Sequence, residues 1–246
     1  MTGKHREQWE QLGETDPYWA VLTNREKRGG KWERDEFFAT GEKEITGLMN
    51  RLDSLGISVE RQTVLDFGCG VGRLARALAS RFNEVLAVDI SAAMLEEARK
   101  ANSDKPNIRF IHNTLSSLED IEDDHVDLVY SSIVLQHIPT VLQQRYLDEF
   151  VRVTKPGGMI VFQTPSAPNL RTWQGWVYRL LGTTNLNRIR RVVLGGSSGI
   201  MEMHCLSRPA IEAQIANHGA KLVQADIDES AGVTFLGYRY YVRVMQ

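Results

Sequence analysis

Residues 63–89 combine two apolar runs, a glycine-rich turn and a helical segment, and this unit most constrains the fold. The runs at 63–67 and 84–90 are apolar almost throughout, which is typical of strands buried on both faces. Alternate glycines occupy 68–72, and residues 72–82 place leucines and alanines at helical spacing. A strand, a turn, a helix and a second strand predict a parallel pair joined by a right-handed crossover.

The same alternation of strands and helices continues along the chain. Further strands are expected at 107–112, 126–132, 159–165, 221–227 and 235–244, and further helices at 41–56, 91–102, 140–154 and 207–218. We therefore predict an α/β fold with a mostly parallel sheet, helices on both faces and an antiparallel pair of final strands.

Two segments interrupt the alternation, although the chain reads as a single domain over 1–246. Residues 1–41 are rich in charge and aromatics, and we expect short helices that form an N-terminal lid. Residues 166–206 are too long for a plain loop and predict an inserted helical cap with a hinge at the glycines of 195–199.

Composition limits the classes of partner. The net charge of −2 over 246 residues argues against a dedicated nucleic-acid binder, although a local basic patch is compatible with it. Cys69 and Cys205 form no CxxC pair, so neither a metal site nor a disulfide is predicted. No apolar run approaches a membrane span and no leader sequence is recognisable, so we expect a cytoplasmic protein without stable membrane insertion. The oligomeric state stays open.

The glycine turn and two acids narrow the ligand. The spacing is G-x-G-x-G with Arg73 following, and not the G-x-G-x-x-G of dinucleotide sites. Asp66, inside the first strand, would repel a pyrophosphate but attract an ammonium group. Asp89 ends the second strand, where an acid can accept hydrogen bonds from ribose hydroxyls. A ligand with a ribose, an amino acid and no phosphate fits this set, and S-adenosylmethionine (SAM) is such a ligand.

Four segments resemble the motifs of the class I, Rossmann-like SAM-dependent methyltransferases. They are VLDFGCGVGRLARAL (64–78), VLAVDIS (85–91), VDLVYSSIVLQHIP (126–139) and LDEFVRVTKPGGMIVFQTP (147–165). The resemblance implies a seven-stranded sheet in the order 3-2-1-4-5-7-6 and SAM as cofactor. The implied cofactor-binding residues are Asp66, Gly68, Cys69, Gly70, Asp89, Ile90, Met94, Thr114, Leu115 and Ser131. The acid that many relatives carry after the third strand is absent, because Asn113, Thr114 and Leu115 stand there.

His137 is the candidate general base, because it follows the fourth strand and imidazole titrates near neutrality. The alternative is that it shapes its loop. Candidate substrate contacts are Trp19, Phe38, Trp173 and His204, and Phe38 is expected just ahead of the first sheet-packing helix.

The predicted reaction is methyl transfer to a small molecule, with an oxygen of a sugar, a glycolipid or a secondary metabolite as acceptor. Transfer to nitrogen or carbon, a non-catalytic SAM-binding protein and a nicotinamide oxidoreductase stay open as alternatives.

Overall fold

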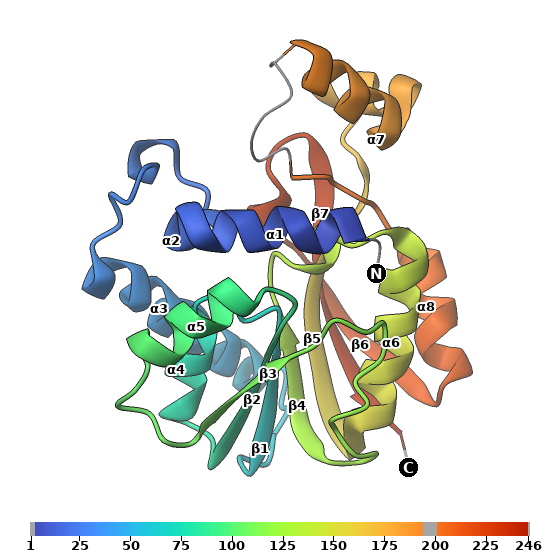
Figure 1. Cartoon of the computed structure of the whole chain (residues 1–246). Coiled ribbons are helices and arrows are strands. Elements are labelled where there is room, and N and C mark those ends of the chain that lie inside the picture. Colours follow the sequence, from blue (N-terminus) through green and yellow to red (C-terminus); the bar gives the residue numbers. More distant parts are fainter. Residues whose placement is uncertain (1–2, 194–200, 246) are drawn as a thin grey trace. The chain divides into compact units, whose positions relative to one another are not determined.

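The computed structural model describes residues 3–193 and 201–245 and contains one seven-stranded sheet in the order β3-β2-β1-β4-β5-β7-β6 (Figure 1). The strands are β1 (Thr63–Phe67), β2 (Glu84–Asp89), β3 (Ile108–His112), β4 (Val126–Ser131), β5 (Thr154–Pro168), β6 (Ala220–Ile227) and β7 (Phe235–Val244). β1 pairs in parallel with β2 and β4, β2 pairs in parallel with β3, and β7 is antiparallel to β5 and β6. The predicted fold class and strand order are confirmed, whereas the hinge expected at 195–199 lies outside the described residues.

The chain divides into two compact units, and the first comprises Met1–Leu118 and His125–Tyr130. Its helices are α1 (Gly3–Thr15), α2 (Pro17–Val21), the 3₁₀ turn η1 (Arg25–Lys27), α3 (Arg34–Ser54), α4 (Arg73–Ala79) and α5 (Ala92–Ala101). β1 is buried along its whole length and β2 is buried except at its two ends, as their continuous apolar runs predict. Ser91 caps α5 as expected, accepting a hydrogen bond from the Met94 amide at 3.1 Å.

Helix α3 begins earlier than the periodicity suggested. The sequence predicted a helix over 41–56, but the structure starts it at Arg34, so Phe37 and Phe38 lie inside the helix and not ahead of it. Both rings are buried, and they contact each other edge to face at 5.5 Å between centroids. This aromatic packing extends α3 by two turns, because tertiary contacts stabilise helices more than local propensity does.

The second unit comprises Glu119–Asp124 and Ser131–Gln246. Its helices are the 3₁₀ turn η2 (Leu135–His137), α6 (Thr140–Val153), α7 (Trp173–Val193), α8 (Arg208–Asn217) and the 3₁₀ turn η3 (Glu229–Ala231). The strand expected at 159–165 was too short, because β7 pairs with β5 as far as Pro168 across a bulge between Pro165 and Ala167. Helix α7 supplies the helical structure expected within 166–206, and non-helical dihedral angles at Gly182 interrupt it.

Within the described part of the chain, no helix is long and apolar enough to cross a membrane.

Candidate functional site

The turn after β1 is built from glycines in the left-handed region. Gly68, Gly70 and Gly72 have φ values of 78°, 52° and 79°, which side chains rarely adopt. A Cβ on Gly70 would lie 2.5 Å from Val21 Cγ2, and one on Gly72 would lie 2.6 Å from Asn102 Nδ2. The alternate glycines are therefore required both by the backbone conformation and by the close approach of neighbouring groups.

The turn is fastened to the end of β2. The Gly68 and Cys69 amides donate to the Val88 carbonyl at 2.8 and 3.0 Å, and the Gly70 amide donates to Asp89 Oδ2 at 2.8 Å. The Ser91 amide donates to Asp89 Oδ1 at 2.9 Å. Burial raises the pKa of Asp89, and these backbone N–H groups act in the opposite direction. Each carboxylate oxygen accepts one of these two bonds and keeps further acceptor capacity, which a pair of hydroxyl groups can use.

Asp66 carries the feature of this site that most demands a ligand. Its side chain is 1% exposed, and neither carboxylate oxygen makes a hydrogen bond of normal geometry with the residues that the structure describes. Burial raises the pKa of Asp66 from 3.8 to about 7; Arg73 and the nearby Ala75 amide lower it, and Glu44 raises it. Buried polar groups are almost always hydrogen-bonded, so an unbonded carboxylate beside a glycine turn fits a cationic group that the protein itself does not supply.

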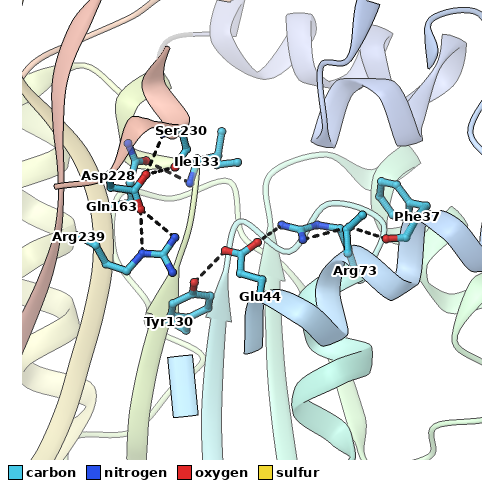
Figure 2. Close-up of polar contacts among 10 residues, drawn as sticks. Phe37, Glu44, Arg73, Tyr130, Ile133, Gln163, Asp228, Ser230 and Arg239 are labelled. Atoms are coloured by element: carbon cyan, nitrogen blue, oxygen red, sulfur yellow. Dashed lines mark hydrogen bonds and ion pairs between the residues drawn. The ribbon is translucent and has the colours of Figure 1, made fainter. Parts of the chain in front are cut away.

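Arg73, Glu44 and Tyr130 form a chain of polar contacts near Asp66 that was not predicted from the sequence. The Arg73 guanidinium is 3% exposed and donates to Glu44 Oε2 at 2.8 Å, and the Tyr130 hydroxyl donates to Glu44 Oε1 at 2.8 Å (Figure 2). Asp66 and Tyr130 are register partners on β1 and β4. The arginine at position 73 was the signal, since a buried arginine needs a carboxylate partner.

The loop after β3 lies beside Asp89, as the assignment of Thr114 and Leu115 to the cofactor site requires. The Asn113 amide donates to the Asp89 carbonyl at 2.9 Å, and Asn113 Oδ1 accepts from the Leu115 amide at 2.9 Å. Leu115 is 50% exposed and Thr114 is half-buried. Ile90 is half-buried and its carbonyl contacts His112 Nε2 at 2.9 Å.

The N-terminal helices contact the same turn. Glu10 on α1 accepts hydrogen bonds from the Ala92 and Ala93 amides at 2.9 and 3.0 Å, at the first turn of α5. Val21, at the end of α2, is the residue that approaches Gly70. Helix α1 therefore contacts the start of α5, and helix α2 contacts the glycine turn. Sequence reasoning missed Glu10, because the contact joins residues 82 positions apart.

Two of the candidate substrate contacts belong to this first unit. Phe38 is buried at 7% exposure between the Arg34 and Arg76 guanidinium groups, each 5.4 Å from the ring centroid. Trp19 is half-buried, and its indole N–H donates to the Asn24 carbonyl at 2.9 Å. Both aromatic rings thus have structural partners of their own.

The remaining predicted residues lie in the second unit, where His137 is held at both ring nitrogens. Its Nδ1 lies 2.9 Å from the Glu202 carbonyl, and its Nε2 lies 3.1 Å from Gln136 Nε2. A carbonyl only accepts, so Nδ1 carries the proton and Nε2 is the acceptor. His137 is 6% exposed, which makes this imidazole part of an ordered network.

That network reaches the start of the loop after β4. Gln163 Nε2 donates to Gln136 Oε1 at 3.3 Å. Gln163 Oε1 accepts from the Ile133 amide at 3.3 Å (Figure 2). Ile133 has φ 63°, a left-handed conformation that is a true outlier for a β-branched residue. Strain of this kind concentrates at functional loops, and it marks 131–138 as a constrained segment.

The second unit also contains the predicted site residues Ser131, His204 and Trp173. Ser131 is 1% exposed at the end of β4. His204 donates its amide to the Gln136 carbonyl at 2.7 Å, and its Nε2 lies 3.5 Å from the Glu202 carboxylate. Burial lowers the pKa of His204 and Glu202 raises it. Trp173 is 73% exposed at the first turn of α7.

Within the described ranges, no three His, Cys, Asp or Glu side chains are grouped to hold a metal ion.

Residues 64–158 match the family model described as "Methyltransferase domain". The chain is 36% identical over 116 residues to a demethylmenaquinone methyltransferase of Clavibacter sepedonicus, covering 46% of each protein. It is 35% identical over 129 residues to a malonyl-[acyl-carrier protein] O-methyltransferase of Pectobacterium atrosepticum, covering 51% of this chain and 47% of the relative. The chain spans about half the length of these curated relatives.

A solved structure supports the fold over nearly the whole chain. The magnesium protoporphyrin IX methyltransferase from Synechocystis, determined with bound S-adenosylhomocysteine (SAH), matches with a TM-score of 0.61 at 17% identity and 97% coverage of each chain. At this identity the likeness concerns the fold.

Proposed function

We propose that this chain, whose residues 64–158 match a methyltransferase-domain model, is a class I SAM-dependent methyltransferase that transfers the methyl group of SAM to a small-molecule acceptor. The observation that carries the proposal is the unbonded, buried carboxylate of Asp66 beside the glycine turn. When bound there, SAM supplies a methyl group that is already activated on a sulfonium. The chain's own residues then have to bind, orient and shield the reactants.

We assign the ammonium of the methionine moiety to Asp66 and the ribose hydroxyls to Asp89. The assignment of Asp66 rests on its missing hydrogen bonds, since a buried charge is stable only when paired. Backbone amides already hold Asp89 at both oxygens, so the carboxylate is oriented before the ligand arrives. The other residues of the proposed cofactor site are Gly68, Cys69, Gly70, Ile90, Met94, Thr114, Leu115 and Ser131.

For the acceptor we propose an oxygen of a sugar, a glycolipid or a secondary metabolite. The malonyl-[acyl-carrier protein] relative is named as an O-methyltransferase, which is in line with oxygen chemistry. Residues 1–41 as a lid and 166–206 as a cap of a single domain belong to the same proposal. Trp19, Phe38, Trp173 and His204 are its acceptor contacts.

The proposed base is His137, because its tautomer suits proton removal from a hydroxyl. The Glu202 carbonyl fixes the proton on Nδ1, which leaves the Nε2 lone pair as the basic site. The Gln136 amide donates to that lone pair, so Gln136 must rotate away before His137 can accept a substrate proton. Without that rotation, His137 serves only to shape the loop.

Calorimetric titration with SAH tests the cofactor site. Asp89→Ala should weaken binding by about tenfold or more, since a hydrogen bond to a charged group contributes about 1.5–3 kcal/mol. Glu96→Ala on α5 is the matched control, because this carboxylate is 69% exposed and forms an ion pair with Lys100 on the same helix. If the parent chain binds no SAH, or binds NADH more tightly, the proposal is wrong.

Methyl transfer from labelled SAM to a panel of hydroxyl, amine and carbon acceptors tests the reaction. If His137 is the base, His137→Asn should lower kcat and remove the acidic limb of the pH profile, whereas KM for SAM should stay unchanged. An unchanged pH profile in this variant would leave His137 with a structural role. SAH binding without any methylated product would favour a non-catalytic SAM-binding protein.

A further inference from the structure

Helix α7 has two unlike sides. Gly175 and Tyr178 are buried, and the Tyr178 ring contacts Phe235 on β7 edge to face at 4.8 Å between centroids. Tyr178, Leu186 and Phe235 form a small buried cluster against which Met203 and Cys205 pack. This side of α7 anchors the helix on the second unit.

The opposite side of α7 is apolar and exposed. Trp176 and Leu180 are 51% and 76% exposed, and their i, i+4 spacing places them on one helical face. Leu170, just before the helix, is 45% exposed, and Val233 is 71% exposed. Asn169 donates hydrogen bonds to the Val233 and Thr234 carbonyls, which ties the start of this segment to the loop before β7.

The charge of the same stretch is one-sided. Residues 169–201 contain five arginines and no acidic residue, in a chain whose net charge is −2. Arg171 and Arg179, which belong to this set, are exposed. An exposed apolar helix face whose own segment carries positive charge and no negative charge is complementary to an anionic surface with an apolar interior.

We propose that α7 is an interfacial helix that seats this protein on an anionic phospholipid bilayer. Tryptophan prefers the headgroup level of a membrane, because its ring is apolar and its N–H is polar. An amphipathic helix with tryptophan and leucine on one side and arginine around it lies in the plane of that interface. Such docking is peripheral, and it goes beyond the methyl transfer proposed above.

A protein partner or a nucleic acid fits these features less well. A nucleic acid would stack a base on Trp176, but the neighbouring Leu170 and Leu180 would then face its charged, hydrated backbone. The five arginines of 169–201 have no acidic residue among them, which favours an anionic surface as the partner. The anionic bilayer is the surface that satisfies the apolar face and the charge together.

Sedimentation of the full chain with sucrose-loaded vesicles tests the proposal. We expect binding to vesicles of equal phosphatidylglycerol and phosphatidylcholine, at least tenfold weaker binding to pure phosphatidylcholine, and loss of binding at high salt. Trp176→Ser with Leu180→Ser should weaken binding to the anionic vesicles at least fivefold. Arg171→Gln with Arg179→Gln should weaken it and flatten its salt dependence.

Ile227→Ser is the matched control, because Ile227 is 80% exposed in the same unit but lies on β6. This variant should bind the vesicles like the parent chain. Thermal unfolding midpoints that agree among the variants show that the fold is kept. The assay contains neither SAM nor an acceptor, so a failure of methyl transfer does not affect it.

Three results would overturn the proposal. The first is no binding of the parent chain to anionic vesicles. The second is vesicle binding that Trp176→Ser with Leu180→Ser leaves unchanged. The third is a dimer that dissociates in this double variant while vesicle binding persists, because the apolar face would then be a contact between two copies.

Discussion

Replacing Asp66 with asparagine should change the pH dependence of stability in a defined direction. The carboxyl has a pKa of 3.8 in a solvated chain and about 7 in the folded protein, chiefly because it is buried. Between these values the folded state holds a proton that the unfolded state has lost. The free energy of unfolding therefore falls as pH rises through this interval. Asparagine does not titrate, so the free energy of unfolding of Asp66→Asn lacks this pH-dependent decrease.

The size of the effect follows from the difference between the two pKa values. Each pH unit corresponds to about 1.4 kcal/mol, so ionised Asp66 costs the ligand-free protein roughly 4 kcal/mol in total. Between pH 5 and pH 8, the free energy of unfolding of the parent chain falls only up to the folded-state pKa of about 7, which is a span of about two pH units. The Asp66→Asn variant should therefore gain about 3 kcal/mol relative to the parent chain over that range.

Urea denaturation of both proteins at pH 5, 6, 7 and 8 measures this difference. Every other titrating group is common to the two chains, so the difference reports Asp66 alone. SAH should stabilise the parent chain and not the variant, because the ammonium pairs with the carboxylate. Below pH 7 the parent's Kd for SAH should rise about tenfold for each unit by which the pH falls, since Asp66 must lose its proton before it can pair with the ammonium.

A difference in stability that does not vary with pH would refute the high pKa of Asp66. So would a parent chain that becomes more stable relative to the variant above pH 7. If the stability difference follows the expected course but SAH binds both proteins equally, the pKa is right and the assignment of the ammonium to Asp66 is wrong.

Two substitutions test the packing around the site. Gly41→Ala should destabilise the protein by about 1–3 kcal/mol, because the added Cβ would lie 2.4 Å from the Arg73 carbonyl oxygen. Gly47→Ala in the same helix meets nothing within 4 Å and should stabilise by up to about 1 kcal/mol in the same urea experiment; equal effects of the two would contradict the close approach of α3 and α4. Ile133→Asn should raise the thermal midpoint through relief of about 1 kcal/mol of strain at φ 63°. Ile133→Val, which keeps the branched Cβ, should be neutral, and a lower midpoint for Ile133→Asn would show that side-chain packing outweighs the strain.

Much of the fold was predictable, because its determinants lie close together in the sequence. Strands β1 and β2 are short apolar runs, and the N-caps Ser91 and Ser207 each accept a hydrogen bond from an amide three residues later. The elements that were misjudged depend on distant partners. Helix α3 starts early because Phe37 and Phe38 pack in the interior, and β5 runs on because β7 pairs with it to Pro168.

The residues of the proposed cofactor site divide in the same way. Asp66, Gly68, Gly70 and Asp89 lie within one strand–turn–helix–strand unit, so their spacing alone suggested a ligand. Arg73 indicated a carboxylate partner, but nothing local identified Glu44 as that partner or Glu10 as the cap of α5. Such contacts form only when segments dozens of residues apart fold together.

The buried charges explain why Asp66 can be kept at all. An isolated carboxylate in this position would stay protonated at neutral pH, because burial dominates its pKa. Arg73 lowers that pKa, but its guanidinium is already paired with Glu44 at 2.8 Å, so it neutralises Asp66 only in part. The pKa of Asp66 therefore stays at about 7. At neutral pH the carboxylate can lose its proton with little loss of free energy when a ligand's ammonium binds. Removing Glu44 would free Arg73 to pair with Asp66 and would lower the pKa of Asp66. In the proposed site, the Glu44–Arg73 pair therefore keeps Asp66 available for a cation from outside the chain.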